Sequence, residues 1–344
     1  MELIKPNALK PNDKIGIFTP SFPAHLEFKE KFLHGIEEIK RMGFEVVLGS
    51  LTEKMMKQGY RSGTPKERAE EFMQLIENKN ITCLMATIGG ICSNSMIEYL
   101  DFDKIAANPK VITGYSDVTS LHLAIHNYTG LITFYGPAVV PTMGEFPNSF
   151  DYSTKSFLEA VMIHRENERE LTAPDKWSNQ MRDAYSDDWK TGHRKWLPNE
   201  GWNSLVEGKG EGPLLVANFN TLMSSAGTTY FPKLDNKILL LEEMSLDLGE
   251  QERKLTQLKY MGIFSKLKGL IFSKPEVNQS ENNPFTYEDL ILETIGPNPQ
   301  FPIITQFDCG HTHPMITLPL GVKCRLIVKK DNINVQLLEP AISV

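Results

Sequence analysis

Ser116 is the residue whose surroundings best fit a nucleophile. It lies in the run Val111-Ile-Thr-Gly-Tyr-Ser-Asp-Val-Thr119, where an apolar strand leads into a glycine and then into a predicted helix. Nucleophilic serines are often presented at such a turn, because the free N–H groups of the helix N-terminus stabilise a developing oxyanion. The run differs from the G-x-S-x-G elbow, and Ser116 or Asp117 could instead cap the helix. Both interpretations stay open at this point.

His311 is a candidate for the base that a serine nucleophile needs. It stands with His313 in the run Phe307-Asp-Cys-Gly-His-Thr-His-Pro314, which follows a predicted strand. An H-x-H pair can also bind a metal ion. No further ligand residues at suitable spacing accompany the pair, so we expect no metal. A metal hydrolase built on His311 and His313 is the less favoured alternative.

Glu242 is a candidate for the carboxylate that orients such a base. It ends the apolar run Lys237-Ile-Leu-Leu-Leu-Glu242. A glutamate at the end of such a strand should be either exposed there or paired with another group. The adjacent Glu243 would point to the opposite face of the strand. The alternative is that Glu242 and Glu243 are two solvated loop carboxylates.

Gly89 and Gly90 are a candidate oxyanion element, since they follow the predicted strand 81–88. The alternative is an ordinary turn at a strand end. The run Gly-Gly-Ile-Cys-Ser-Asn is not a G-x-G-x-x-G motif, and the chain has no G-x-x-x-x-G-K-[ST] loop. Folds that bind a nucleotide cofactor therefore lose support, and we expect no cofactor.

The elements that must position these residues follow from the hydrophobic pattern. Strand-like and helix-like runs alternate over the first 150 residues, which predicts an α/β fold with a parallel sheet covered on both faces. The predicted strands are 14–19, 44–48, 81–88, 111–113 and 132–135. Sites in such sheets gather where strands end.

Three segments make up the predicted organisation. Residues 1–164 form an N-terminal α/β domain that carries Ser116. Residues 165–211 contain all four tryptophans and few aliphatic residues, which indicates a connection with long loops. Residues 212–344 form a smaller α/β domain that carries Glu242 and His311, with strands from residue 214 onward and a closing hairpin of 321–328 and 332–337.

Composition excludes several classes of protein. The 344 residues carry a formal net charge of -7 without a basic run, so a nucleic-acid polymer is a poor partner. Four scattered cysteines do not form a disulfide scaffold. The N-terminal run lacks the apolar core of a secretory signal, and no stretch approaches a membrane span. We expect a cytoplasmic protein with no membrane association.

The motifs together resemble the LD-carboxypeptidase serine peptidases, which include muramoyltetrapeptide carboxypeptidases and microcin C self-immunity proteins. The matching segments occur in family order across nearly the whole chain. They are residues 14–21, 87–90, 114–119, 130–137, 218–222, 238–243 and 309–311.

The resemblance implies a Ser-Glu-His triad, with Ser116 as nucleophile, His311 as general base and Glu242 as its orienting carboxylate. It implies an oxyanion hole made by the backbone N–H groups of Asp117 and Gly90. It also implies a flavodoxin-like N-terminal half, a smaller C-terminal domain, a site in the cleft between them, and a homodimer.

Departures from the family pattern bear on the substrate. Ile88 stands where the murein-cleaving branch commonly has arginine, and the tryptophan-containing insert is closer to the microcin-immunity branch. That branch cleaves a peptidyl-nucleotide amide and stacks an aromatic residue on the base, so Trp177 or Trp189 would stack on substrate unless they pack the loop onto the domain. By resemblance, Asn218 and Asn220 are further substrate contacts.

The sequence thus predicts a serine hydrolase that cleaves an amide bond near the C-terminal end of a small peptide or peptidyl-nucleotide conjugate. A cytoplasmic murein tetrapeptide LD-carboxypeptidase is the first alternative. A non-catalytic protein that binds a peptide or nucleotide conjugate is an alternative of another class, and it would not need all three of Ser116, Glu242 and His311.

Overall fold

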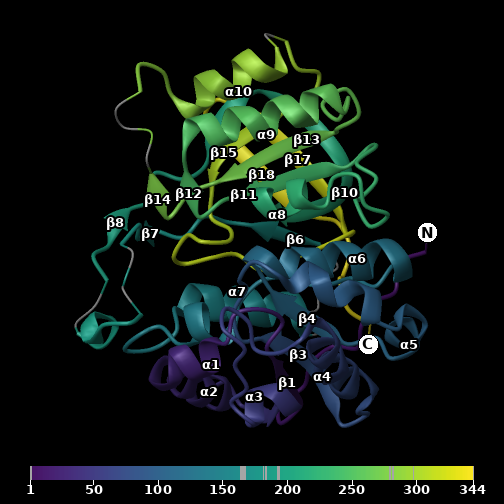
Figure 1. The fold of residues 1–344 in the computed structure, drawn as a ribbon. Helices are drawn as coiled ribbons and strands as arrows, with labels where there is room; N and C mark the ends of the chain where they lie inside the picture. The colour runs from purple at the N-terminus through teal and green to yellow at the C-terminus, as the bar shows by residue number, and fades with distance from the viewer. Residues whose placement is uncertain are drawn as a thin grey trace.

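Two β-sheets form the framework of the molecule, one in each half. The computed structural model describes residues 2–162, 168–180, 182, 184–191, 194–278, 280, 283–296 and 298–343. Figure 1 shows the purple-to-blue elements of the N-terminal part below the green-to-yellow elements of the C-terminal part. The molecule therefore has the predicted α/β class with two stacked parts.

The N-terminal sheet has the strand order of a flavodoxin-like fold. Its order is β16-β5-β4-β3-β1-β2, and β1 to β5 run parallel. Read from the far edge, the order 2-1-3-4-5 is the flavodoxin-like one, which confirms the predicted fold. The five parallel strands are β1 Lys14–Phe18, β2 Glu45–Leu48, β3 Ile81–Ala86, β4 Val111–Gly114 and β5 Phe134–Tyr135.

The residues of α4 (Pro65–Glu77) explain both where this helix begins and which of its faces is buried. In α4 the Thr64 side chain accepts from the Glu67 N–H while the Glu67 carboxylate accepts from the Thr64 N–H, a reciprocal cap that satisfies two otherwise unpaired donors. Residues Phe72, Leu75 and Ile76 of α4 are buried against the sheet core. The apolar positions predicted for this helix are thus confirmed.

The C-terminal sheet has a parallel centre and antiparallel edges. Its order is β6-β18-β17-β10-β11-β13-β15-β9, with β10, β11, β13 and β15 parallel. Its strands are β6 Arg169–Leu171, β9 Asn203–Val206, β10 Gly208–Asn218, β11 Ile238–Glu242, β13 Gly269–Ser273, β15 Ile303–Phe307, β17 Lys323–Lys329 and β18 Asn332–Leu337. The predicted closing hairpin is confirmed as β17 and β18.

Part of this sheet comes from residues that the sequence pattern assigns to loops. Strand β10 begins at Gly208 rather than at Leu214, because Gly208–Pro213 pairs antiparallel with β17. Strands β6 and β9 also lie within the segment 165–211. A run of glycines and charged residues has no hydrophobic period to reveal such pairing, so the strand start predicted at residue 214 was wrong by six residues.

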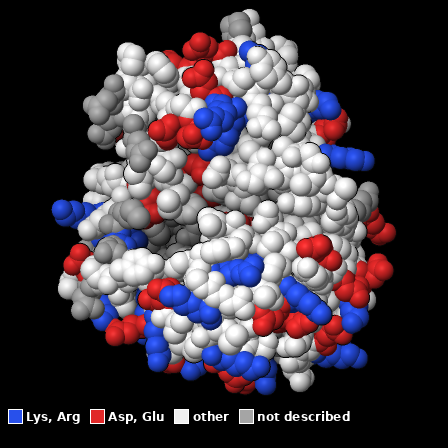
Figure 2. Space-filling model, in the orientation of Figure 1, with Lys and Arg blue, Asp and Glu red and all other residues white. Residues whose placement is uncertain are grey.

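One short strand crosses from the C-terminal half into the N-terminal sheet. Strand β16 (Leu318–Pro319) pairs antiparallel with β5, with Leu318 opposite Tyr135. Figure 2 shows a hollow between the two halves, with acidic and basic side chains intermixed around this face.

Within the part of the chain that the structure describes, no helix is long and apolar enough to cross a membrane.

Candidate active site

The backbone at Ser116 makes a strained turn between β4 and a helix. Strand β4 ends at Gly114, and the short 3-10 helix Ser116–Val118 leads into α6 (Thr119–Thr129). Ser116 has φ 63, a left-handed value that is uncommon for a residue with a side chain and that clusters at functional sites. Its N–H donates to the Tyr135 hydroxyl at 2.9 Å.

Neither Ser116 nor Asp117 acts as a helix cap. The N-cap positions of the 3-10 helix and of α6 belong to Tyr115 and Val118, and neither makes a side-chain cap hydrogen bond. Instead, Asp117 Oδ2 accepts from the backbone N–H groups of Cys92 and Ser93, each at 2.9 Å. The capping alternative therefore does not describe this turn, and Asp117 ties it to the loop after β3.

The glycine pair lies directly against this turn. A Cβ at position 89 would lie 3.0 Å from the Asp117 nitrogen and 3.1 Å from Ser116 Cβ. Gly90 has φ 143, and a Cβ there would lie 2.3 Å from Ser21 Oγ, so only glycine fits. Among the described residues, the Gly90 N–H donates no hydrogen bond. An unpaired donor beside Ser116 suits a developing oxyanion.

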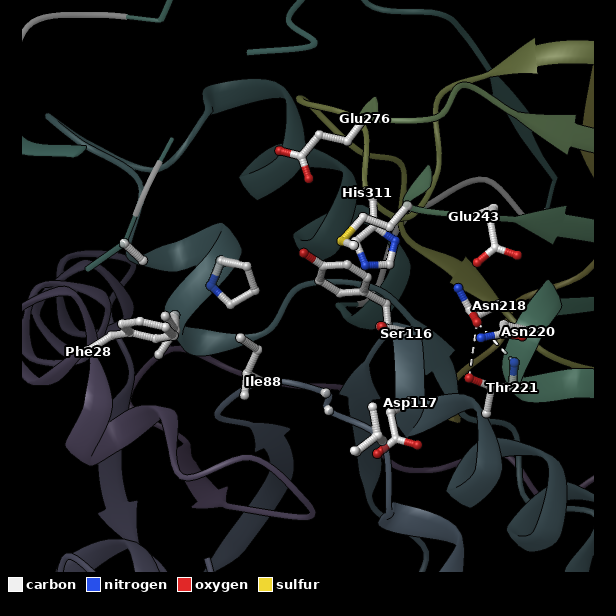
Figure 3. A pocket seen from close by; sticks show the side chains of 18 of the residues that line it. Phe28, Ile88, Ser116, Asp117, Asn218, Asn220, Thr221, Glu243, Glu276 and His311 are labelled. Atoms are coloured by element: carbon white, nitrogen blue, oxygen red, sulfur yellow. Dashed lines mark hydrogen bonds between the residues drawn. The ribbon is translucent and has the colours of Figure 1, made fainter. Parts of the chain in front are cut away.

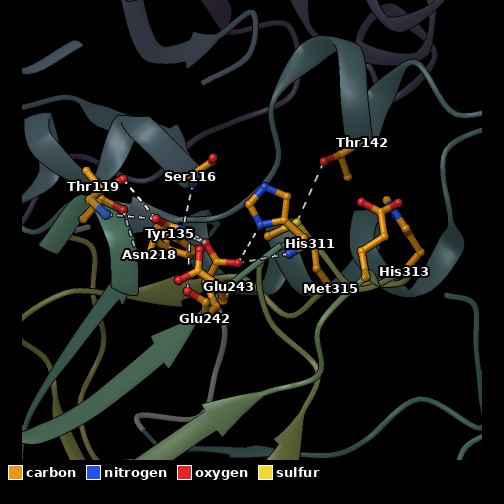
Figure 4. Close-up of polar contacts among 12 residues, drawn as sticks. Ser116, Thr119, Tyr135, Thr142, Asn218, Glu242, Glu243, His311, His313 and Met315 are labelled. Carbon is orange, nitrogen blue, oxygen red and sulfur yellow. Dashed lines mark hydrogen bonds and ion pairs between the residues drawn. The ribbon is translucent and has the colours of Figure 1, made fainter. Parts of the chain in front are cut away.

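Glu242 lies at the end of β11 and is 1% exposed. Its Oε2 accepts from His311 Nδ1 at 2.7 Å, while its Oε1 accepts from the Tyr135 hydroxyl at 2.5 Å and from Asn218 Nδ2 at 2.9 Å (Figure 4). Burial alone would raise the pKa of Glu242, but His311, Tyr135 and Asn218 together hold that pKa below its ordinary value. The carboxylate is thus ionised and oriented.

His311 sits on a loop after β15 that can approach Glu242 because of Gly310. Gly310 has φ 77, and a Cβ there would lie 2.2 Å from Glu242 Oε2. With Nδ1 bonded to the carboxylate, Nε2 is the ring nitrogen left to act as a base. Burial lowers the pKa of His311, but the charge and hydrogen bond of Glu242 outweigh it, so that the pKa is raised.

Ser116 and His311 line one cavity of about 530 Å³. Figure 3 shows Asn218, Asn220 and Thr221 to one side of Ser116, and Phe28 and Ile88 to the other. No hydrogen bond joins the Ser116 hydroxyl to the His311 ring in the described part of the chain, although apo active sites often tighten such contacts only when substrate binds.

The two predicted amide contacts differ in what they touch. Asn220 is exposed and lines the cavity. Asn218 also lines it, but its Oδ1 accepts from the Thr221 N–H and its Nδ2 donates to Glu242. The amide of Asn218 is therefore engaged within the protein, where it holds the carboxylate in place.

Trp177 and Trp189 do not line the cavity. Trp189 is 6% exposed and packs near Phe146 and His34, with ring centroids 6.3 Å away in both cases. The Trp177 ring lies beneath the Lys274 ammonium at 5.5 Å. These contacts match the packing alternative for both tryptophans.

His313 is engaged away from His311. Its Nε2 lies 3.3 Å from Glu276 Oε1, whereas the His311 Nδ1 binds Glu242. Within the described ranges, no group of three or more His, Cys, Asp or Glu side chains is placed to hold a metal ion. The two histidines of the H-x-H run thus serve two different carboxylates.

Sequence reasoning missed Tyr135, Lys31 and Glu276. Tyr135 ends β5 and is fully buried, and its hydroxyl joins the Ser116 backbone to Glu242. Its place at a strand end is the signal that could have revealed it, as it did for Glu242. Lys31 and Glu276 line the same cavity, but no motif marks them.

Comparison with known proteins agrees with this arrangement. The family models for the LD-carboxypeptidase N-terminal domain and C-terminal domain match residues 15–136 and 211–326. The microcin C7 self-immunity protein MccF of Escherichia coli is 40% identical over 338 residues, which cover 96% of this chain and 94% of that protein. The chain belongs to the LD-carboxypeptidase family. It is an enzyme of the serine peptidase type.

Within the family, the chain is on the microcin-immunity side. A putative carboxypeptidase of Vibrio cholerae is 39% identical over 92% of each chain. The structure of MccF in complex with aspartyl sulfamoyl adenosine superposes with a TM-score of 0.92 and 38% identity, covering 99% of this chain and 100% of that one. The expected family and its branch are therefore confirmed.

Proposed function

We propose that Ser116, His311 and Glu242 are the catalytic triad of this enzyme. The observation that carries the proposal is the 2.7 Å contact between Glu242 and His311 Nδ1 in a cavity that Ser116 also lines. Such a contact fixes the tautomer in which Nε2 is free to accept a proton and stabilises the imidazolium that then forms.

The reaction follows as acylation and deacylation. Ser116 Oγ attacks the scissile carbonyl and passes its proton to His311 Nε2. The oxyanion of the tetrahedral intermediate is held by the backbone N–H groups of Gly90 and Asp117. His311 then protonates the leaving amine, and the acyl-serine forms. Water attacks this ester with His311 again as base, which releases the acid and restores Ser116.

We propose small aminoacyl- or peptidyl-nucleotide conjugates as substrates. Support comes from the relative MccF, whose structure is known in complex with aspartyl sulfamoyl adenosine. The cavity of about 530 Å³ also has a volume that suits a small molecule. By the family resemblance we expect a cytoplasmic homodimer, and we expect residues 1–164 and 212–344 to act as its two domains.

One product assay tests the proposed function. The protein is incubated with aspartyl sulfamoyl adenosine and with a murein tetrapeptide, and products are read by mass spectrometry. Release of aspartate from the conjugate is the expected result. Release of the terminal residue of the tetrapeptide alone would instead favour wall-peptide trimming. Binding of either compound without cleavage would contradict a catalytic role and favour sequestration.

The pH dependence of kcat/KM should report His311. The base works only when its ring is neutral, so activity is lost as pH falls through its pKa. Because Glu242 raises that pKa, the midpoint of the acidic limb is expected above the ordinary histidine value of about 6.5. A pH profile of kcat/KM measures it, and a midpoint well below 6.5 would contradict the assignment.

Tyr135→Phe should lower kcat by roughly 10–100-fold, because it removes one hydrogen bond to a charged carboxylate and one from the nucleophile's backbone. KM should change little, since Tyr135 does not line the cavity. The matched control is Tyr128→Phe on α6, a tyrosine whose hydroxyl bonds Thr229 and does not line the cavity. Equal kinetic parameters for Tyr135→Phe and wild type would refute this positioning role.

A further inference from the structure

Lys31 places a buried positive charge in the active-site cavity. It lies on α2 (Lys29–Arg41), is 7% exposed and lines the cavity that holds Ser116. Within the described residues its ammonium forms no hydrogen bond or ion pair. Burial lowers the pKa of Lys31. A buried ammonium without a partner is costly unless an anion meets it.

The two nearby arginines, Arg182 and Arg194, differ from Lys31 because each forms an ion pair. Glu145 is 1% exposed, and its two oxygens bind Arg182 Nη1 at 3.1 Å and Arg194 Nη2 at 2.9 Å. Glu145 also acts on the charge of Lys31: burial lowers the pKa of Lys31, and Glu145 makes the largest opposing contribution, although no ion pair joins the two among the described residues. Arg182 and Arg194 line the same cavity as Lys31, but their charges are paired with Glu145, whereas Lys31 has no ion pair among the described residues.

Glu276 brings a negative charge to the same cavity. It follows β13, lines the cavity, and is drawn near His311 in Figure 3. Its one hydrogen bond among the described residues joins it to His313 at 3.3 Å. Burial would raise the pKa of Glu276, but His313, His311 and Arg194 hold it below its ordinary value. Glu276 is thus an ionised carboxylate with bonding capacity to spare.

The two charges sense each other without touching. Burial lowers the pKa of Lys31, and the charges of Glu145 and, to a smaller extent, Glu276 oppose that lowering, yet no ion pair joins Lys31 to Glu276 in the described part of the chain. Two opposite charges in one cavity would normally close on each other. Here they lie on different elements, α2 for Lys31 and the segment after β13 for Glu276, and both line the cavity.

We propose that Lys31 and Glu276 form a subsite for a zwitterionic residue of the substrate, with its free carboxylate on Lys31 and its free ammonium on Glu276. The inference rests on the proposed function and narrows its substrate class. An aspartyl group linked through its α-carboxyl presents this pair of charges, and so does a diamino-dicarboxylic residue of a wall peptide. A residue blocked at its amine does not.

Matched substrates test each charge separately. Wild type is compared on aspartyl, asparaginyl and N-acetyl-aspartyl sulfamoyl adenosine, which carry both charges, the ammonium only and the carboxylate only. Loss of a charged hydrogen bond should lower kcat/KM by roughly 10–100-fold for each truncated compound. A wall tetrapeptide, intact or amidated at its side-chain carboxylate, tests the second source in the same way.

Two variants test which side chain binds each charge of the substrate. Lys31→Met should lower kcat/KM for the aspartyl compound while leaving the asparaginyl compound nearly unchanged. Glu276→Gln should lower kcat/KM for the aspartyl compound while leaving the N-acetyl-aspartyl compound nearly unchanged. Lys29→Met, an exposed lysine on the same helix, and Glu293→Gln, exposed on α10 (Tyr287–Ile295), are the matched controls. Uniform loss across all three compounds would overturn the subsite.

Calorimetry separates this inference from the proposed function. Binding of the three compounds is measured on Ser116→Ala, which needs no turnover. Tighter binding of the aspartyl compound that disappears in Ser116→Ala/Lys31→Met supports the subsite even if wild type cleaves nothing, a result that would contradict only the proposed function. Equal binding of all three compounds refutes the subsite. If Lys31→Met does not fold, Lys31→Arg should retain the preference that Lys31→Gln loses.

Discussion

Turnover is expected to fall by about 10⁴-fold or more in Ser116→Ala, because the variant loses the hydroxyl oxygen that we propose forms the acyl intermediate. The fold should persist. The Ser116 hydroxyl makes no hydrogen bond among the described residues, while the backbone contact to Tyr135 does not depend on the side chain. Single-turnover kinetics with the conjugate measures the loss, and thermal unfolding checks the fold.

The left-handed backbone at this position offers a control for the serine variant. Ser116→Gly keeps φ 63 at no steric cost and should be as inactive as Ser116→Ala, yet at least as stable. Ser116→Cys retains a nucleophile and should acylate without matching wild-type turnover. Activity within tenfold of wild type in the alanine or glycine variant would show that another residue attacks the substrate.

Glu242→Gln is expected to lower kcat by about 10⁴-fold, the size seen when a triad carboxylate becomes an amide. The reason is the tautomer of His311. A glutamine amide that donates to His311 Nδ1 leaves the ring proton on Nε2, where it cannot accept a proton from Ser116. Steady-state kinetics measures the loss, and the NMR shifts of the ring nitrogens report the tautomer.

The matched control for Glu242→Gln is Glu293→Gln, an exposed glutamate whose neutralisation should leave kcat unchanged. Glu242→Ala is expected to be both inactive and less stable, since it leaves Tyr135, Asn218 and His311 without their shared acceptor in a buried site. A fully active Glu242→Gln enzyme would remove Glu242 from the proposed triad.

Much of the N-terminal sheet could be predicted because its strands have hydrophobic patterns that are local in the sequence. Short apolar runs that alternate with helical spacing predict the parallel strands β1 to β5, whereas their flavodoxin-like order was expected only from the family resemblance. Glu242 could be singled out because a carboxylate after four buried apolar residues must be paired or face a site. A glycine next to His311 could be noted, but not that its Cβ would collide with Glu242.

The rest depends on contacts between distant segments. Gly208–Pro213 has no apolar period and becomes a strand only because β17 pairs with it. Tyr135 reads as an ordinary core residue until its hydroxyl is seen between Ser116 and Glu242. Lys31 reads as a solvated helix residue, because nothing near it in sequence indicates that the other elements bury it.

Strand β16 affects the order in which the two halves of the protein can fold during synthesis on the ribosome. Domains usually fold as they emerge, the N-terminal one first, but here the edge beside β5 waits for Leu318. Until then β5 has an open edge, which is a template for wrong pairing. A nascent chain stalled before residue 318 should therefore bind chaperones longer than one stalled after it, although every residue of the first five strands has been made.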